Sequence, residues 1–259
     1  MAIILEVKNR TKMYKGSKSR VIRTSVFLLE KLWNTSVFIK KFALDPEYRS
    51  IHHLQLFNSR AVHQTTPFTY MDRYPEIFSA CHTFLKDKEN VKILSYGCST
   101  GEEVLTLRKY FPNAEIIGAD INKHSLLKCN NLKTDNKIKF IYSSTKNIQS
   151  HGPFDAIFCM AVFQRKPHFI AAKGIKSLKK IYPFEKFENE VSKLDKHVKP
   201  SGLLVIHFSQ YSLEDTKVSQ NYKALGDYNQ DSYQNPVFDK ISNIRSGQHS
   251  QKSIFIKNE

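Results

Sequence analysis

The chain has 259 residues, of which 41% are hydrophobic and 25% charged, and 40 basic against 24 acidic residues leave a formal charge of +16. This composition supplies a buried core and excludes global disorder, and nine glycines and nine prolines exclude collagen-like and low-complexity architectures. The length predicts one large domain, or a catalytic domain with a smaller companion.

Two kinds of segment are also excluded by pattern. No run of about 18 uncharged apolar residues occurs, and the N-terminus is charged at Glu6, so neither a transmembrane helix nor a signal peptide is expected. The four cysteines are 17, 31 and 30 residues apart without a CxxC pair, which predicts reduced thiols and no metal site. We therefore expect a soluble, cytoplasmic protein.

The positive charge is concentrated in two segments. Residues 1–44 carry a net charge of +8 and residues 164–186 a net charge of +6, so the other 192 residues carry only +2. This distribution predicts local recognition of an acidic partner rather than general binding to polyanions.

Residues 1–89 are expected to form a basic, mainly helical N-terminal region. Within residues 21–44, apolar side chains form a helical stripe at Ile22, Val26, Leu29, Trp33 and Val37. The helix either packs on the following domain with its charges solvated, which we favour, or lies on an anionic membrane surface or a partner.

Residues 90–259 are expected to form a second domain of alternating strands and helices. Strands are predicted at 91–97, 115–120, 137–142, 154–160 and 203–207, helices at 102–111, 123–130 and 184–198, a turn at 199–202, and an antiparallel pair at 237–241 and 253–257. This alternation predicts parallel β-α-β units in a sheet that is buried on both faces.

The loop after the first of these strands, Gly97-Cys-Ser-Thr-Gly-Glu-Glu103, exposes backbone N–H groups at a helix N-terminus. It matches neither the dinucleotide fingerprint GxGxxG nor the phosphate-binding GK[ST] ending. Its two glutamates, with Asp120 at the end of the next strand, suit a ligand that has an ammonium group and a ribose diol. S-adenosylmethionine has both groups and no phosphate; alternatively, the glutamates only stabilise the helix dipole.

Four segments together resemble the class I S-adenosylmethionine-dependent methyltransferases, and in particular the CheR-type branch, which methylates glutamate side chains of chemotaxis receptors. They are the loop 97–103, Ala119-Asp-Ile121, Gly152-Pro-Phe-Asp-Ala-Ile-Phe-Cys159 and Lys199-Pro-Ser-Gly-Leu-Leu-Val205. The resemblance covers roughly residues 60–210. It implies an α/β, Rossmann-like, mostly parallel sheet of about seven strands with an antiparallel last strand, preceded by a helical N-terminal extension.

The resemblance also implies a methyltransferase whose cofactor is S-adenosylmethionine. Carried over residue by residue, the cofactor-binding positions are Gly97, Ser99, Thr100, Gly101, Glu103, Asp120, Ile121, Asn147 and Met160. Glu103 would face the amino group of the cofactor and Asp120 its ribose. Two departures concern the acceptor side: Met160-Ala-Val162 replaces the usual Arg-Asn-Val, and an upstream arginine is missing, for which Arg73 is the nearest substitute.

The basic segment 164–186 follows the fourth strand of the domain, at the sheet edge where open α/β sheets bind ligands. We expect Arg165, Lys166, Lys173 and Tyr182 to contact the acceptor, and Arg165 and Tyr211 are candidates for a catalytic role. A proximity mechanism needs no strong base when the acceptor is already nucleophilic.

The expected acceptor is an acidic protein segment, a protein carboxylate or a small molecule. RNA or DNA methylation rests on charge alone, and a catalytically decayed binding module is the third alternative. The basic segment could also be only a solvated face, because Lys173, Lys176 and Lys180 have helical spacing.

Overall fold

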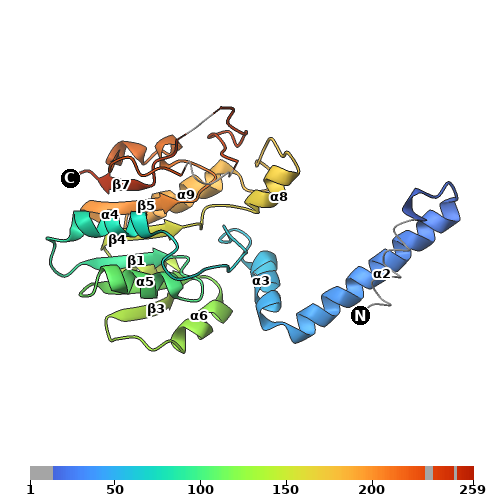
Figure 1. Ribbon diagram of the computed structural model, residues 1–259, viewed down its shortest axis with the longest axis horizontal. Coiled ribbons are helices and arrows are strands. Elements are labelled where there is room, and N and C mark those ends of the chain that lie inside the picture. The colour runs from blue at the N-terminus through green and yellow to red at the C-terminus, as the bar shows by residue number, and fades with distance from the viewer. Residues whose placement is uncertain (1–13, 231–235, 248–249) are drawn as a thin grey trace. The chain divides into compact units, whose positions relative to one another are not determined.

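The computed structural model describes residues 14–230, 236–247 and 250–259 (Figure 1). Internal contacts divide the chain into two compact units, unit 1 with residues 1–52 and unit 2 with residues 53–259. This division falls earlier than the domain boundary predicted after residue 89, because α4 (Pro75–Leu85) packs into the core of unit 2. Among the described residues, no helix is both long and apolar enough to span a membrane.

Unit 1 contains η1 (Tyr14–Gly16), α2 (Arg20–Leu44) and most of α3 (Pro46–Phe57). The carboxylate of Asp45, between the two helices, accepts a hydrogen bond of 3.0 Å from the backbone N–H of Tyr48 in the first turn of α3. The ring of Phe38 in α2 lies 6.1 Å from that of Tyr48 and 5.3 Å from that of His52. Aromatic contacts therefore join the end of α2 to α3.

Unit 2 is built on a seven-stranded sheet in the order β3-β2-β1-β4-β5-β7-β6 (Figure 1). The strands are β1 (Lys92–Tyr96), β2 (Glu115–Asp120), β3 (Ile138–Tyr142), β4 (Phe154–Met160), β5 (Val198–His207), β6 (Tyr222–Ala224) and β7 (Ile254–Lys257). β1 to β5 pair in parallel, and β7 is antiparallel to β5 and to β6. The predicted Rossmann-like fold class is confirmed.

Helices cover both faces of this sheet. They are α4, α5 (Glu102–Tyr110), α6 (Lys123–Asn130), α7 (Thr145–His151), α8 (Pro167–Ala172) and α9 (Phe184–Asp195), with two short turns, η2 (Leu213–Asp215) and η3 (Ser219–Asn221). Apolar residues of α4, α5 and α6 pack on one face with Ile93, and those of α7, α8 and α9 pack on the other with Leu94. Successive residues of β1 thus face opposite layers, which explains its uninterrupted apolar run.

Two elements differ from the prediction. The turn predicted at 199–202 is a bulge inside β5, since Val198 pairs with Phe154 while Leu203 pairs with Ala156. The predicted strand 237–241 is wrong: β6 is the antiparallel partner of β7, and the carboxylate of Asp239 accepts backbone hydrogen bonds that form a turn. The side chain of Asp239 competes here with strand pairing.

Candidate cofactor and acceptor site

The loop between β1 and α5 lies at the carboxyl ends of the parallel strands. Gly97, Ser99 and Gly101 have positive φ angles of 79°, 50° and 98°, so the backbone turns sharply before α5 begins. A Cβ atom on Gly97 would lie 2.6 Å from Cγ2 of Val162, which follows β4. The loop is therefore packed tightly between the ends of β1 and β4.

Asp120 is the last residue of β2, and its carboxylate holds this loop in place by hydrogen bonding. One carboxylate oxygen accepts a hydrogen bond of 2.9 Å from the backbone N–H of Ser99, and the other accepts one of 2.6 Å from Asn122. Burial raises the pKa of Asp120 to about 6, although the backbone N–H groups oppose this shift. Each carboxylate oxygen retains acceptor capacity, as required to bind ribose hydroxyls.

Glu103 lies in the first turn of α5, where Oε1 accepts a hydrogen bond of 2.7 Å from the Ser95 hydroxyl. Burial raises the pKa of Glu103 to about 8, against the opposing effects of Ser95 and Arg73. An ammonium group beside Glu103 would stabilise its ionised form. The residues present therefore fit the amino group of S-adenosylmethionine.

The segment before α4 contacts the β1–α5 loop. The Ser99 hydroxyl donates a hydrogen bond of 3.0 Å to the carbonyl of Pro67. Arg73 lies 5.1 Å from the ring centre of Tyr74 and 5.8 Å from that of Phe208, and its charge lowers the pKa of Glu103. The arginine considered as a substitute for the missing family residue is thus on the cofactor side of the loop.

The other residues predicted to bind the cofactor lie along the same edge. Asn147, in α7, donates a hydrogen bond of 2.9 Å from its side chain to the carbonyl of Tyr142, at the end of β3. Seven of the nine predicted positions are partly exposed: Gly97, Ser99, Thr100, Glu103, Asp120, Ile121 and Asn147. Gly101 and Met160 are buried, so only the other seven residues have surface that a ligand could contact.

On the acceptor side, Arg165 follows β4 and is held by a hydrogen bond of 2.7 Å from its backbone N–H to the side chain of Gln210. Nη1 of Arg165 is buried and has no hydrogen-bond partner in the part of the chain that the structure describes. Lys166 and Lys173 are exposed, and α8 ends at Ala172. Because α8 ends before Lys173, the spacing of Lys173, Lys176 and Lys180 does not place them on one face of a helix.

Tyr182 and Tyr211 are not placed as predicted. Both side chains are fully buried, and the Tyr211 hydroxyl donates a hydrogen bond of 2.6 Å to the carbonyl of Tyr182. The Tyr211 ring packs in the core against the rings of Tyr182, Phe184 and Phe187. Neither hydroxyl is presented to an acceptor, because apolar packing outweighs exposure of these large side chains.

A buried polar cluster that sequence reasoning missed lies beside Arg165. Nδ1 of His63 is 2.7 Å from the Tyr182 hydroxyl, while its Nε2 is buried and has no hydrogen-bond partner among the residues described. Burial lowers the pKa of His63 to about 4, and the charge of Arg165 adds to this effect. No local motif signals this cluster, since His63 and Tyr182 are 119 residues apart.

The cluster is connected to the end of β1. The Tyr96 hydroxyl donates a hydrogen bond of 2.7 Å to Glu190, and the Tyr96 ring stacks on Phe163 at 6.2 Å. Because Phe163 is two residues before Arg165 and Tyr96 directly precedes Gly97, this contact brings the segment predicted to contact the acceptor close to the loop predicted to bind the cofactor.

This strand order, the loop after β1 and the acid at the end of β2 define a class I S-adenosylmethionine-dependent methyltransferase domain. Residues 87–255 match a family model described as a methyltransferase domain, and the chain belongs to that family. The match is to methyltransferase domains in general and does not distinguish the CheR-type branch.

Two curated relatives are proteins of Rickettsia prowazekii (strain Madrid E). "Uncharacterized protein RP028" is 26% identical over 123 residues, covering 44% of this chain and 49% of the relative. "Uncharacterized protein RP789" is 33% identical over 92 residues, covering 34% of this chain and 17% of the relative. The chain thus spans about half or less of the length of these relatives.

Similar solved structures include the plantazolicin methyltransferase BpumL in complex with SAH, at 20% identity and a TM-score of 0.37, covering 70% of this chain and 61% of that chain. PKMT2 from Rickettsia typhi is similar at 20% identity and a TM-score of 0.37, and the match covers 54% of this chain and 26% of that chain.

Proposed function

We propose that this chain transfers the methyl group of S-adenosylmethionine to an acidic acceptor, a carboxylate of a protein side chain or of a small molecule. The observation that carries the proposal is Arg165, whose buried Nη1 has no hydrogen-bond partner among the described residues. An unsatisfied buried guanidinium nitrogen is costly, and a carboxylate would pair with it. The CheR-type resemblance favours the same acceptor class.

The chemistry requires little beyond positioning. When bound beside Asp120 and Glu103, S-adenosylmethionine would supply an activated methyl group for in-line transfer to an acceptor oxygen, with its thioether as the leaving group. Asp120 and Glu103 would orient the cofactor, and Arg165 would orient the acceptor. A carboxylate is ionised at neutral pH, so no side chain must remove a proton.

Several exposed lysines follow Arg165 in the chain. Lys166, Lys173, Lys176, Lys179 and Lys180 are all exposed, so they would attract acidic acceptors over a longer range than Arg165. The same charges would attract phosphates, so nucleic acid is an outcome that the experiment must separate.

The experiment combines calorimetry with a transfer assay. The protein should bind S-adenosylhomocysteine, and incubation with methyl-labelled cofactor and cell lysate should label a fraction that releases its label under mild alkali, as carboxyl methyl esters do. Arg165→Ala should lower kcat/KM about 10- to 100-fold, the loss of one charged hydrogen bond, without changing affinity for S-adenosylhomocysteine.

Arg60→Ala removes an arginine of unit 2 that is exposed, unlike Arg165; it is the control and should leave kcat/KM unchanged. Alkali-stable label in RNA or DNA would replace the proposal with nucleic-acid methylation. Cofactor binding without any labelled product would identify a decayed binding module.

A further inference from the structure

One side of α2 exposes a broad apolar surface, which we name the apolar arc. Its members are Val21, Ile22, Leu28, Leu29, Leu32, Trp33, Ile39 and Leu44, all exposed. At the angular spacing of an α-helix these positions cover about half of the helix circumference. Leu29 and Leu32, near its centre, expose 55% and 67% of their surface.

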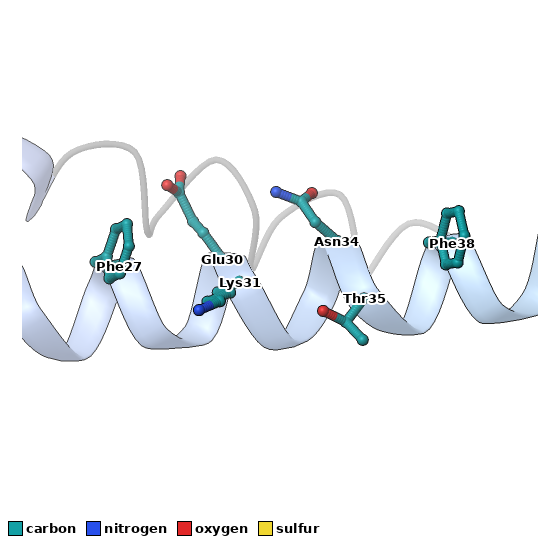
Figure 2. A pocket seen from close by; sticks show the side chains of 6 residues that line it. All are labelled: Phe27, Glu30, Lys31, Asn34, Thr35 and Phe38. Atoms are coloured by element: carbon teal, nitrogen blue, oxygen red, sulfur yellow. The ribbon is translucent and has the colours of Figure 1, made fainter. Parts of the chain in front are cut away.

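Most of the described contacts of α2 in unit 1 lie on the other side, and Val26, at the edge of the apolar arc, is the one buried residue of this helix. Figure 2 shows that Phe27, Glu30, Asn34 and Phe38 project from one side of the helix, where they help to line an open pocket. Glu30 forms an ion pair of 2.7 Å with Lys15, and Phe38 is the residue that packs on α3. Glu30, Asn34 and the packed Phe38 are thus opposite the apolar arc, while Phe27 on the same side exposes 63% of its surface.

The width of the apolar arc indicates what could cover it. A two-stranded coiled coil buries a narrow seam of two positions per heptad, which is less than half of the circumference. The acyl region of a bilayer can instead cover a wide apolar face of a single helix, and amphipathic helices that lie in the membrane interface have such a face.

The charges around the apolar arc complement an anionic surface. Residues 14–44 contain seven exposed basic side chains, Lys15, Lys18, Arg20, Arg23, Lys31, Lys40 and Lys41. Their one acidic residue, Glu30, is already paired with Lys15. Long basic side chains can place their stems along apolar surface while their charges reach lipid headgroups.

We propose that α2 binds the surface of a bilayer rich in anionic phospholipids, with the apolar arc in the acyl boundary and the basic side chains at the lipid phosphates. This association is independent of the proposed methyl transfer. It would place the catalytic domain beside a membrane and concentrate it there.

The chain carries its own probe, because Trp33 in the apolar arc is its single tryptophan. With vesicles of phosphatidylcholine containing about one third phosphatidylglycerol, we expect a blue shift of Trp33 emission and co-sedimentation of the full chain. Vesicles of phosphatidylcholine alone should give a smaller shift, and about 0.5 M salt should weaken binding to the anionic vesicles.

Two double variants add the same charge to different sides of α2. Leu29→Glu with Leu32→Glu should reduce vesicle affinity at least tenfold more than Thr24→Glu with Asn34→Glu, which alters exposed positions outside the apolar arc. Calorimetry with S-adenosylhomocysteine should give the same affinity for both variants and so show that unit 2 is folded.

Three results would overturn the proposal. The first is the absence of a Trp33 shift with anionic vesicles at low salt. The second is an equal loss in both double variants, which would show that net charge alone controls binding. The third is a concentration-dependent dimer that shifts Trp33 emission without vesicles, which would assign the apolar arc to a second copy of the chain.

Discussion

Glu103 is the side chain whose ionisation connects the site to pH. Its pKa is raised from 4.5 to about 8 by burial, so the folded state holds this proton more tightly than the unfolded state does. Without cofactor, stability should therefore fall as pH rises from about 4.5 to about 8.

Cofactor binding should reverse this preference, because an ammonium group favours the ionised carboxylate. Below pH 8 binding must then displace a proton, so affinity for S-adenosylhomocysteine should rise by up to about tenfold per pH unit. Calorimetry from pH 6.5 upward, above the pKa of about 6 of Asp120, measures this slope. Glu103→Gln should abolish the slope, and an unchanged slope in that variant would contradict the assigned role.

Asp155 illustrates a residue with a purely structural charge. Its side chain exposes 1% of its surface and contacts Nζ of Lys88 at 2.8 Å and of Lys199 at 2.7 Å. Burial alone would raise its pKa, but the two lysines and a backbone N–H outweigh burial and hold the pKa below its ordinary value. This stabilisation is present above the ordinary carboxyl pKa and is lost as pH falls through the lower folded value.

Asp155→Ala should therefore reduce the free energy of unfolding by about 2 to 3 kcal/mol, less than for a fully buried pair because both lysines are partly exposed. Urea unfolding at neutral pH measures this loss. Asp87→Ala, at an exposed acid, should change the unfolding free energy by less than about 0.5 kcal/mol. Equal effects of the two substitutions would exclude a special contribution of Asp155.

At the scale of elements, the β1–α5 loop depends on the segment that follows α6. Gly101 has φ of 98°, and a Cβ atom there would lie 2.6 Å from Cδ1 of Leu132, beyond α6. Gly101→Ala should therefore combine backbone strain with overlap and cost about 2 to 4 kcal/mol. It should also weaken cofactor binding, since the start of α5 must move.

Gly174→Ala is the matched control for this substitution. Gly174 also has positive φ, 58°, but a Cβ atom there would meet nothing within 4 Å. The control should cost only about 1 kcal/mol of backbone strain. Thermal or urea unfolding of both variants isolates the overlap with Leu132, and equal losses would show that the loop has room for a side chain.

The elements also show the limits of pattern reasoning. The four strands and the helices α5 and α6 between residues 92 and 160 follow the predicted order because their apolar runs and glycine turns are local signals, whereas the short helix α7 was not predicted. The antiparallel partner of β7 was not predicted correctly, because Tyr222–Ala224 is too short to show a period and Asp239 ends the competing segment.

For the whole molecule, the division into units has a direct consequence. Both hydrophobic clusters of the sheet consist of residues from Tyr74 to Ile256, all within unit 2. Residues 53–259 alone should therefore fold and bind S-adenosylhomocysteine within about twofold of the full chain, since their core is complete. Calorimetry and circular dichroism test this, and an unfolded fragment would show that unit 1 is part of the core.

The sequence by itself determined the Rossmann-like fold class, the cofactor and the positions of the loop 97–103 and Asp120, because these depend on periodicity and on short spacings. Tertiary structure decided the acceptor side. It buried Tyr182 and Tyr211, left Nη1 of Arg165 without a partner and brought His63 to Tyr182 across 119 residues. Contacts between residues so far apart leave no local pattern, because side-chain packing and desolvation arise only when the strands and helices assemble.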